Sequence, residues 1–161
     1  MIAVWPSHRR RLPKAQCRQY LGPRQSPARS RAQVADVGCG HGWSTVLMAK
    51  AFPNSQFIGY DFHPSSIEHA QAHAREHDVG SNTRFEVATA KNYPEKGFDL
   101  VAFFDCLHDM GAPAGAAAQV RQSLKQDGSW MIVEPMAGDR LEDNLNPVSR
   151  IYYAASTYSV T

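Results

Sequence analysis

Three glycines at alternate positions, Gly38, Gly40 and Gly42, follow an apolar run that ends in Asp36. Glycine adopts positive φ angles readily and has no Cβ, so a backbone built this way can lie directly against a ligand. A helix is expected to begin at about Trp43, immediately after the last glycine. In open α/β sheets, ligands bind beyond the carboxyl ends of the strands, where the winding reverses. The spacing therefore predicts a ligand-binding turn.

A second acid, Asp61, ends the next apolar run, Phe57 to Tyr60. A carboxylate has two acceptor oxygens that can take both hydroxyls of a ribose, as in dinucleotide-binding folds. The carboxyl ends of parallel strands meet at one edge of a sheet, which brings this acid to the glycine turn. The turn and the acid together predict a cofactor that contains adenosine.

The glycine spacing separates this turn from two other nucleotide sites. A nicotinamide fingerprint is G-x-G-x-x-G, which leaves a helix N-terminus open to a pyrophosphate. Here the third glycine comes one residue early and Trp43 follows it. A P-loop is excluded because no G-K-[ST] follows. The G-x-G-x-G form, with an acid two residues before it, resembles motif I of class I S-adenosyl-L-methionine-dependent methyltransferases.

Later blocks extend this resemblance in the order typical of the family. They are the ribose acid Asp61, an adenine-lining segment at 87–90, a strand at 98–105 that meets the methionine end, and a hairpin at 124–129 that resembles L-x-x-G-G. More narrowly, residues 104–109 and 144–147 resemble a bacterial, actinobacterial-type group with a winged-helix-like N-terminal segment. That segment is not recognisable in this sequence.

The resemblance implies S-adenosyl-L-methionine as the cofactor and no metal. The residues that it implies for cofactor binding are Asp36, Gly38, Cys39, Gly40, Asp61, Phe62, Thr89, Ala90, Phe104 and Asp105. The sequence departs from the family at Thr89, where many members have an acid that holds the adenine amino group. A hydroxyl can accept a hydrogen bond there, but without charge.

His108 is the candidate catalytic residue. Methyl transfer from a sulfonium mainly needs orientation, but an oxygen nucleophile usually has to lose its proton to a base. His108 follows the strand at 98–104 and resembles the L-H-D histidine of small-molecule O-methyltransferases, with Asp109 beside it. The alternative is a histidine that only packs or hydrogen-bonds the following loop.

Other histidines and tyrosines have structural interpretations. His69, His73 and His77 lie at i, i+4 and i+8 of a predicted helix, and we expect a solvated helix edge there rather than a metal site. His41, within the glycine turn, is expected to line the cofactor pocket. Three tyrosines lie near the end of the chain, Tyr152, Tyr153 and Tyr158. They are expected either to cover a substrate pocket or to pack in an apolar core.

Short apolar runs alternate with amphipathic stretches from residue 32 onward, which predicts an α/β fold. We expect a Rossmann-like, doubly wound sheet of about five parallel strands, without the usual C-terminal antiparallel strands. The predicted strands are 33–37, 56–60, 83–87, 98–104 and 129–134, and the predicted helices are 43–51, 65–77, 114–125 and 147–155. The helix at 65–77 is expected to begin with a capping box, Ser65-x-x-Glu68, and to bury Ile67, Ala70 and Ala74. The helix at 114–125 is expected to bury Ala117, Val120 and Leu124 and to end before Gly128.

Charge divides the chain into two parts. Residues 1–31 hold eight of the 17 Lys and Arg residues and no acid, so the remainder is acidic although the net charge is +2. With four prolines and no apolar period, residues 1–31 are expected to be a disordered basic tail. Interpretations of this tail are a nucleic-acid arm, a transit peptide or a mis-started leader. Residues 32–161 are expected to be a methyltransferase domain that is incomplete at its C-terminus.

Two functional hypotheses follow. The first is O-methylation of an aromatic or quinone-like small molecule in the cytoplasm, with no membrane or nucleic-acid partner. The second is a non-catalytic, cofactor-binding regulatory module or an inactive gene fragment. Class I domains resemble a seven-stranded sheet of order 3-2-1-4-5-7-6, so the fifth strand is expected to be an open edge. A homodimer could then form through that edge or through the missing N-terminal region.

Overall fold

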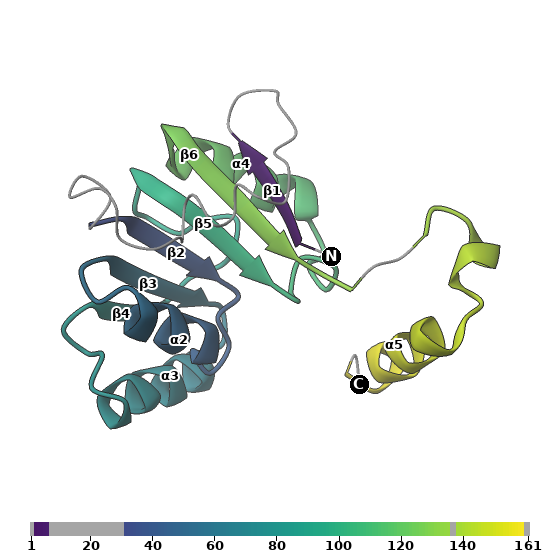
Figure 1. Cartoon of the computed structure of the whole chain (residues 1–161), viewed down its shortest axis with the longest axis horizontal. Helices are drawn as coiled ribbons and strands as arrows, with labels where there is room; N and C mark the ends of the chain where they lie inside the picture. Colours follow the sequence, from purple (N-terminus) through teal and green to yellow (C-terminus); the bar gives the residue numbers. More distant parts are fainter. Residues whose placement is uncertain (1, 7–30, 136–137, 160–161) are drawn as a thin grey trace.

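The computed structural model describes residues 2–6, 31–135 and 138–159, and its main feature is one twisted sheet (Figure 1). Within these residues the sheet has six strands in the order β1-β6-β5-β2-β3-β4. They are β1 (Ile2–Pro6), β2 (Gln33–Val37), β3 (Gln56–Asp61), β4 (Thr83–Val87), β5 (Phe98–Phe104) and β6 (Leu124–Val133). The strands β2 to β6 are mutually parallel. The predicted doubly wound α/β fold with five parallel strands is confirmed.

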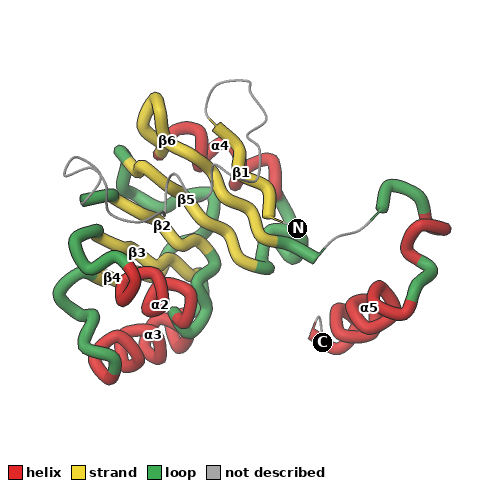
Figure 2. Tube along the Cα trace, in the orientation of Figure 1, coloured by secondary structure: helices red, strands yellow, loops and turns green. Residues whose placement is uncertain are grey.

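Helices cover both faces of the sheet (Figure 2). The helices α2 (Trp43–Ala51) and α3 (Pro64–Glu76) share one buried cluster with β2 to β5, through Val46, Ile67 and Ala70. The helix α4 (Pro113–Ser123) packs into the opposite cluster through Ala116 and Val120. Because successive side chains of a strand alternate between faces, β2, β3, β5 and β6 each contribute to both clusters.

The beginning of α3 differs from the prediction. The helix begins at Pro64 after His63, and no side chain caps it. The Ser65 hydroxyl lies 2.9 Å from the His63 Nδ1 instead of bonding to the backbone, so the predicted capping box is wrong. Proline suits this first helical position because its missing N–H would have no partner there. The predicted inner face of Ile67, Ala70 and Ala74 is buried as expected.

The boundary between α4 and β6 also differs. The helix was expected to reach Lys125, but it ends at Ser123 and the strand begins at Leu124. The residues that α4 buries are Ala116, Val120 and Ser123, one residue earlier than two of those predicted. A register shift between Phe98 and Leu100 of β5 accommodates the residues around Gly128. The segment that resembled a hairpin is therefore the first half of a long strand.

The edge of β6 is covered by β1. The two strands are antiparallel, with Ile2 opposite Val133 and Pro6 opposite Ser129. The expectation of an open edge at the fifth parallel strand is therefore wrong, and so is the expectation of disorder for residues 2–6. The rest of the expected basic tail, residues 7–30, lies outside the described residues.

The last helix, α5 (Pro147–Ser159), follows a short 3-10 helix, Leu141–Asn144, and lies apart from the sheet (Figure 1). Its apolar side chains are exposed rather than buried, including Val148 at 62%, Ile151 at 70% and Tyr152 at 50%. Neither role considered for Tyr152 and Tyr153 is therefore seen, since both are exposed. The side chain of Tyr158 lies outside the described part. Among the described residues, no helix combines the length and the apolar character that crossing a membrane requires.

Candidate functional site

The glycine turn is fastened to the neighbouring strand. The backbone N–H groups of Gly38 and Cys39 both donate to the Tyr60 carbonyl oxygen of β3, at 2.8 and 3.0 Å. Gly38 and Gly40 have φ angles of 73° and 52°, in the left-handed region where a side chain is strained. A Cβ on Gly40 would meet nothing within 4 Å. The turn therefore presents bare backbone to open space beyond the carboxyl end of β2.

Asp61, at the end of β3, holds this turn. Its Oδ2 accepts the Gly40 N–H at 2.9 Å, and its Oδ1 accepts the His63 N–H at 2.9 Å. Each carboxylate oxygen has two lone pairs, so one acceptor position on each remains for a ribose hydroxyl. The same side chain can thus set the shape of the turn and bind a nucleoside.

Asp36, at the centre of the sheet, is 1% exposed. The hydroxyls of Ser44 and Thr45 both donate to its Oδ2 at 2.6 Å, while its Oδ1 has no partner among the described residues. Burial raises the pKa of this carboxyl, the two hydroxyls lower it, and the charge of Asp61 raises it. A buried carboxylate oxygen without a partner is costly, and it suits a ligand that brings positive charge.

A hollow of about 480 Å³ opens beside Asp61, between the ends of β3 and β4. Its lining is mostly apolar with a few polar groups, which suits a nucleobase. The lining residues are Phe62, Glu86, Val87, Ala88, Thr89, Asn92 and Pro94. The sequence analysis identified Phe62 and Thr89 here but missed Asn92. Ala90 packs against the buried cluster on the α4 side instead of lining the hollow.

These observations fit the expected cofactor. The unpartnered Asp36 oxygen matches a cationic methionine end, Asp61 matches a ribose, and the hollow matches an adenine. Cys39 is buried, and burial raises the pKa of its thiol above the ordinary range, so the thiol stays protonated and inert. Its backbone, rather than its sulfur, belongs to the turn.

The end of β5 forms the other side of the site. Phe104 is half-buried, and the next residue, Asp105, has a φ of 53°. A non-glycine residue in this left-handed region is uncommon and marks a backbone that its surroundings hold in place. The Asp105 N–H donates to the Val133 carbonyl of β6 at 2.7 Å. The chain is therefore turned sharply where it leaves the sheet toward His108.

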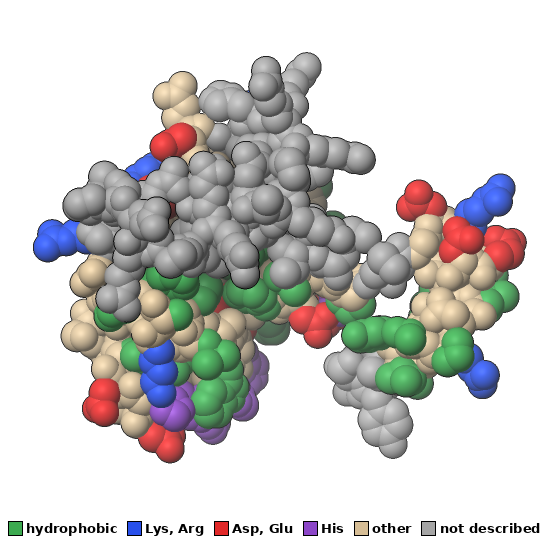
Figure 3. All heavy atoms as spheres, in the orientation of Figure 1, with side chains coloured by type: hydrophobic (Ala, Val, Ile, Leu, Met, Phe, Trp, Pro, Cys, Tyr) green, Lys and Arg blue, Asp and Glu red, His purple; other side chains and the backbone are tan. Residues whose placement is uncertain are grey.

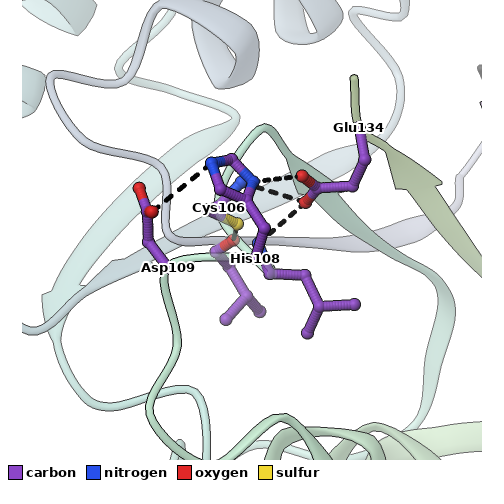
Figure 4. Close-up of polar contacts among 6 residues, drawn as sticks. Cys106, His108, Asp109 and Glu134 are labelled. Carbon is purple, nitrogen blue, oxygen red and sulfur yellow. Dashed lines mark hydrogen bonds and ion pairs between the residues drawn. The ribbon is translucent and has the colours of Figure 1, made fainter. Parts of the chain in front are cut away.

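His108 pairs with Glu134, the residue that follows β6 (Figure 4). The imidazole Nδ1 is hydrogen-bonded to Glu134 Oε2, and Nε2 lies 3.4 Å from Asp109 Oδ1. The hydrogen bond to Glu134 raises the pKa of His108, burial lowers it, and the charges of Glu134, Asp109 and Asp105 raise it. The pair has the geometry of a base whose orientation is set by a carboxylate.

Glu134 also organises the loop that carries His108. Its Oε1 accepts the backbone N–H groups of Cys106 and Leu107, at 3.1 and 2.8 Å. The Cys106 thiol in turn lies 3.2 Å from the Val37 carbonyl and donates to it, because burial raises the thiol pKa to about 12. The sequence analysis missed Glu134, since its role depends on the pairing of β5 with β6.

Asp105, His108 and Glu134 each bring a ligand atom to within 4.8 Å of the other two. This set of two carboxylates and one imidazole has the chemistry of a divalent-cation site as well as that of a base. The raised pKa of His108 means that a proton competes with a metal for its imidazole.

The histidine row on α3 is less solvated than expected. His73 and His77 are partly buried against Trp43 of α2, with ring centroids 4.2 and 5.5 Å apart. His41 stacks on His69 at 4.7 Å, and His73 Nδ1 donates to the His41 carbonyl at 2.9 Å. The imidazole of His41 therefore packs against α3, and its expected place along the cofactor pocket stays a prediction. Figure 3 shows these histidines gathered beside hydrophobic side chains over α2 and α3.

Comparison with known proteins adds independent information. A family model described as a methyltransferase domain matches residues 28–158. The uncharacterized methyltransferase YcgJ of Bacillus subtilis is 28% identical over 127 residues, which are 76% of this chain and 49% of that protein. Its crystal structure has a TM-score of 0.62 at 29% identity, covering 71% of this chain and 49% of that one.

Two relatives have named acceptors. A malonyl-[acyl-carrier protein] O-methyltransferase of Acetivibrio thermocellus is 32% identical over 105 residues, covering 63% of this chain and 35% of that protein. A 27-O-demethylrifamycin SV methyltransferase of Amycolatopsis mediterranei is 33% identical over 104 residues, covering 63% and 38%. The chain thus spans half or less of the length of each of these relatives.

Proposed function

Since the chain belongs to the methyltransferase domain family, we propose that it methylates an oxygen of a small aromatic or quinone-like acceptor, using S-adenosyl-L-methionine. The observation that carries this proposal is the pairing of His108 with Glu134 beyond the carboxyl ends of β5 and β6. We assign the activity to residues 32–161 and place it in the cytoplasm, because Cys39 and Cys106 are free thiols.

The cofactor of this family is S-adenosyl-L-methionine, which supplies a methyl group on a sulfonium that is ready for displacement. Asp61 and the glycine turn are proposed to hold the ribose, Phe62 and Thr89 the adenine, and Asp36 the cationic end. Phe104 and Asp105 form the wall between the methionine end and the acceptor. None of these residues has to move a proton.

His108 is proposed to take the proton from the acceptor hydroxyl as the oxygen bonds to the methyl carbon. Glu134 keeps the imidazole oriented and stabilises the imidazolium that forms, so it is a positioning residue. Oxygen is favoured over nitrogen as the acceptor because a neutral amine needs no base of this strength. Two of the relatives named above are also O-methyltransferases.

Two measurements test the proposal. Isothermal titration with S-adenosylhomocysteine tests the cofactor site, and a folded sample that shows no binding would refute it. Transfer of labelled methyl groups to a panel of phenols and hydroquinones tests the reaction. Cofactor binding without methylation of any acceptor would favour the regulatory module over the enzyme.

A matched pair of histidine variants tests the base. His108→Ala should lower kcat at least about 100-fold, the range typical of general bases, with little change in the affinity for S-adenosylhomocysteine. His77→Ala removes a histidine that contacts Trp43 on the far side of the glycine turn, and it should leave turnover unchanged. Equal turnover in the two variants would remove the base assignment.

A further inference from the structure

The geometry points to Asn92 as the residue that selects adenine, by pairing with the amino group and a ring nitrogen of the base. This inference rests on the proposed function, because it concerns the cofactor of the same site. It also supplies a partner for the adenine amino group, which the acid expected at the position of Thr89 would otherwise hold.

Asn92 enters the hollow from a tight turn. Its backbone N–H donates to the Thr89 carbonyl at 3.0 Å, which closes the turn and brings residues 89 and 92 to one side. Both residues line the hollow together with Phe62. Asn92 thus lines the space next to Phe62, the residue that follows the ribose acid Asp61, where the base is proposed to lie.

The residue after Asn92 anchors this turn in the core. Tyr93 is 1% exposed, and its hydroxyl lies 2.7 Å from the Ser123 hydroxyl of α4. Its carbonyl accepts the Gln119 side-chain N–H at 2.7 Å. These contacts of Tyr93 hold the backbone of the turn in a defined place, from which the Asn92 side chain extends.

The chemistry of an amide matches adenine. The carbonyl oxygen of asparagine can accept from the exocyclic amino group while its NH₂ donates to N7, as in the bidentate contacts of asparagine to adenine in DNA. Hypoxanthine presents acceptors at both of these places, so it cannot form the same pair. Thr89 offers one hydroxyl and cannot make both contacts. Glu86 also lines the hollow, but its Oε1 is paired with Arg84 Nε at 2.6 Å.

Phe62 complements Asn92. Its ring is 72% exposed, which is unusual for a phenylalanine and leaves a face on which a base can stack. Stacking on an aromatic ring tolerates any base and so supplies affinity without selectivity. Phe62 is therefore expected to supply affinity for any purine, and Asn92 to supply selectivity for adenine.

The test compares two ligands that differ only in the base. S-adenosylhomocysteine carries the amino group, and S-inosylhomocysteine carries a carbonyl oxygen in its place. The wild-type chain should prefer the adenine form by about 5- to 150-fold, the range given by one bidentate pair. Asn92→Ala should bind both ligands equally, because the adenine form weakens while the inosine form does not.

Two further variants sharpen the result. Asn92→Asp keeps the acceptor for the amino group and adds a charge that repels the carbonyl oxygen of the inosine form, so it should still prefer the adenine form. Lys91→Ala, at the exposed position beside Asn92 that does not line the hollow, should retain the wild-type preference, and Phe62→Ala should weaken both ligands alike. An unchanged preference in Asn92→Ala would overturn the assignment, as would a preference lost in Lys91→Ala. A wild-type chain that binds neither ligand would contradict the proposed function itself.

Discussion

A Cβ atom on Gly38 would lie 2.8 Å from the Sγ of Cys106 and 3.0 Å from its Cβ. The glycine turn after β2 and the loop after β5 are therefore in direct contact, with no room for a side chain between them. The first belongs to the proposed cofactor site and the second carries His108. Gly38 is needed both for this approach and for its φ of 73°.

Gly38→Ala should destabilise the fold and weaken cofactor binding. The left-handed backbone alone costs about 1–2 kcal/mol for a residue with a Cβ. In a domain of this size, each kcal/mol corresponds to roughly 2–4 °C in Tm. Thermal unfolding of Gly38→Ala and of Gly38→Ala/Cys106→Gly separates the causes, because the second variant removes both the Sγ and the Cβ that crowd the new methyl group but not the φ strain. Gly80→Ala, with open space around its Cβ, is the control and should unfold as the wild type does.

The activity should rise with pH through a midpoint above the ordinary histidine pKa of 6.5, because the hydrogen bond to Glu134 raises the pKa of His108. A base works only when neutral, so the raised pKa moves the rising limb to higher pH. Glu134→Gln should move that midpoint down and lower kcat. The pH dependence of kcat in the two proteins measures both effects. If Glu134→Gln left the pH dependence of kcat unchanged, this would contradict the positioning role of Glu134.

The same raised pKa makes a small contribution to stability. Protonated His108 is favoured in the folded chain, so this contribution is present at pH values below 6.5 and is lost as the pH rises through the higher folded pKa. Solvent screens the exposed imidazole. We therefore expect the change in Tm across this range to differ only slightly between wild type and Glu134→Gln.

Asp36→Asn should stabilise the free protein while weakening its affinity for S-adenosylhomocysteine. Burial raises the pKa of Asp36, so ionisation of this carboxyl at neutral pH costs folding energy. The amide keeps an oxygen for Ser44 and Thr45 but removes the charge that a cationic ligand needs. Thermal unfolding with and without the ligand tests this. Equal Tm gains from the ligand in both proteins would show that Asp36 does not contact it.

Asp61→Ala should lower the affinity for S-adenosylhomocysteine more than Asp61→Asn does. The alanine loses both the acceptor for Gly40 N–H and the proposed ribose contacts, whereas the asparagine keeps one acceptor oxygen. Two lost hydrogen bonds to a charged group correspond to a loss of at least about 100-fold. Calorimetric titration of the two variants gives the comparison, and similar affinities in both would contradict it.

Treatment with EDTA should leave turnover unchanged. Asp105, His108 and Glu134 are close enough to share a cation, but the proton that Glu134 stabilises on His108 competes with one. The assay is run on the chelated protein and again after addition of Mn²⁺ or Zn²⁺. If EDTA abolished the activity and an added metal restored it, His108 would not be the base. The acceptor would then be activated by a bound metal.

The central part of the fold could be predicted from sequence because its signals are local. The strands at 33–37 and 83–87 and the helix at 43–51 have the predicted bounds, since short apolar runs and the glycine turn delimit them. The contacts of Glu134 could not be predicted. They arise when β6 pairs with β5, which brings residues 106–108 and 134 together across the sheet edge.

The ends of the chain were harder to predict, because their structure also depends on contacts between residues far apart in the sequence. The prolines and arginines of residues 1–31 resemble a disordered segment, yet Ile2–Pro6 pair with β6, a contact that no local pattern indicates. The helical spacing of Val148 and Ile151 correctly predicted α5. It could not show that their side chains stay exposed, because that depends on where the helix lies.

The antiparallel pairing of β1 with β6 has a practical consequence for protein production. Ile2 lies opposite Val133, one residue before Glu134, so a purification tag fused ahead of residue 2 would emerge beside the His108 pair. Such a tag, particularly one made of histidines, would crowd the space beside His108 or collect metal there. Tags on the C-terminal side of α5, or tags removed by a protease, avoid this interference.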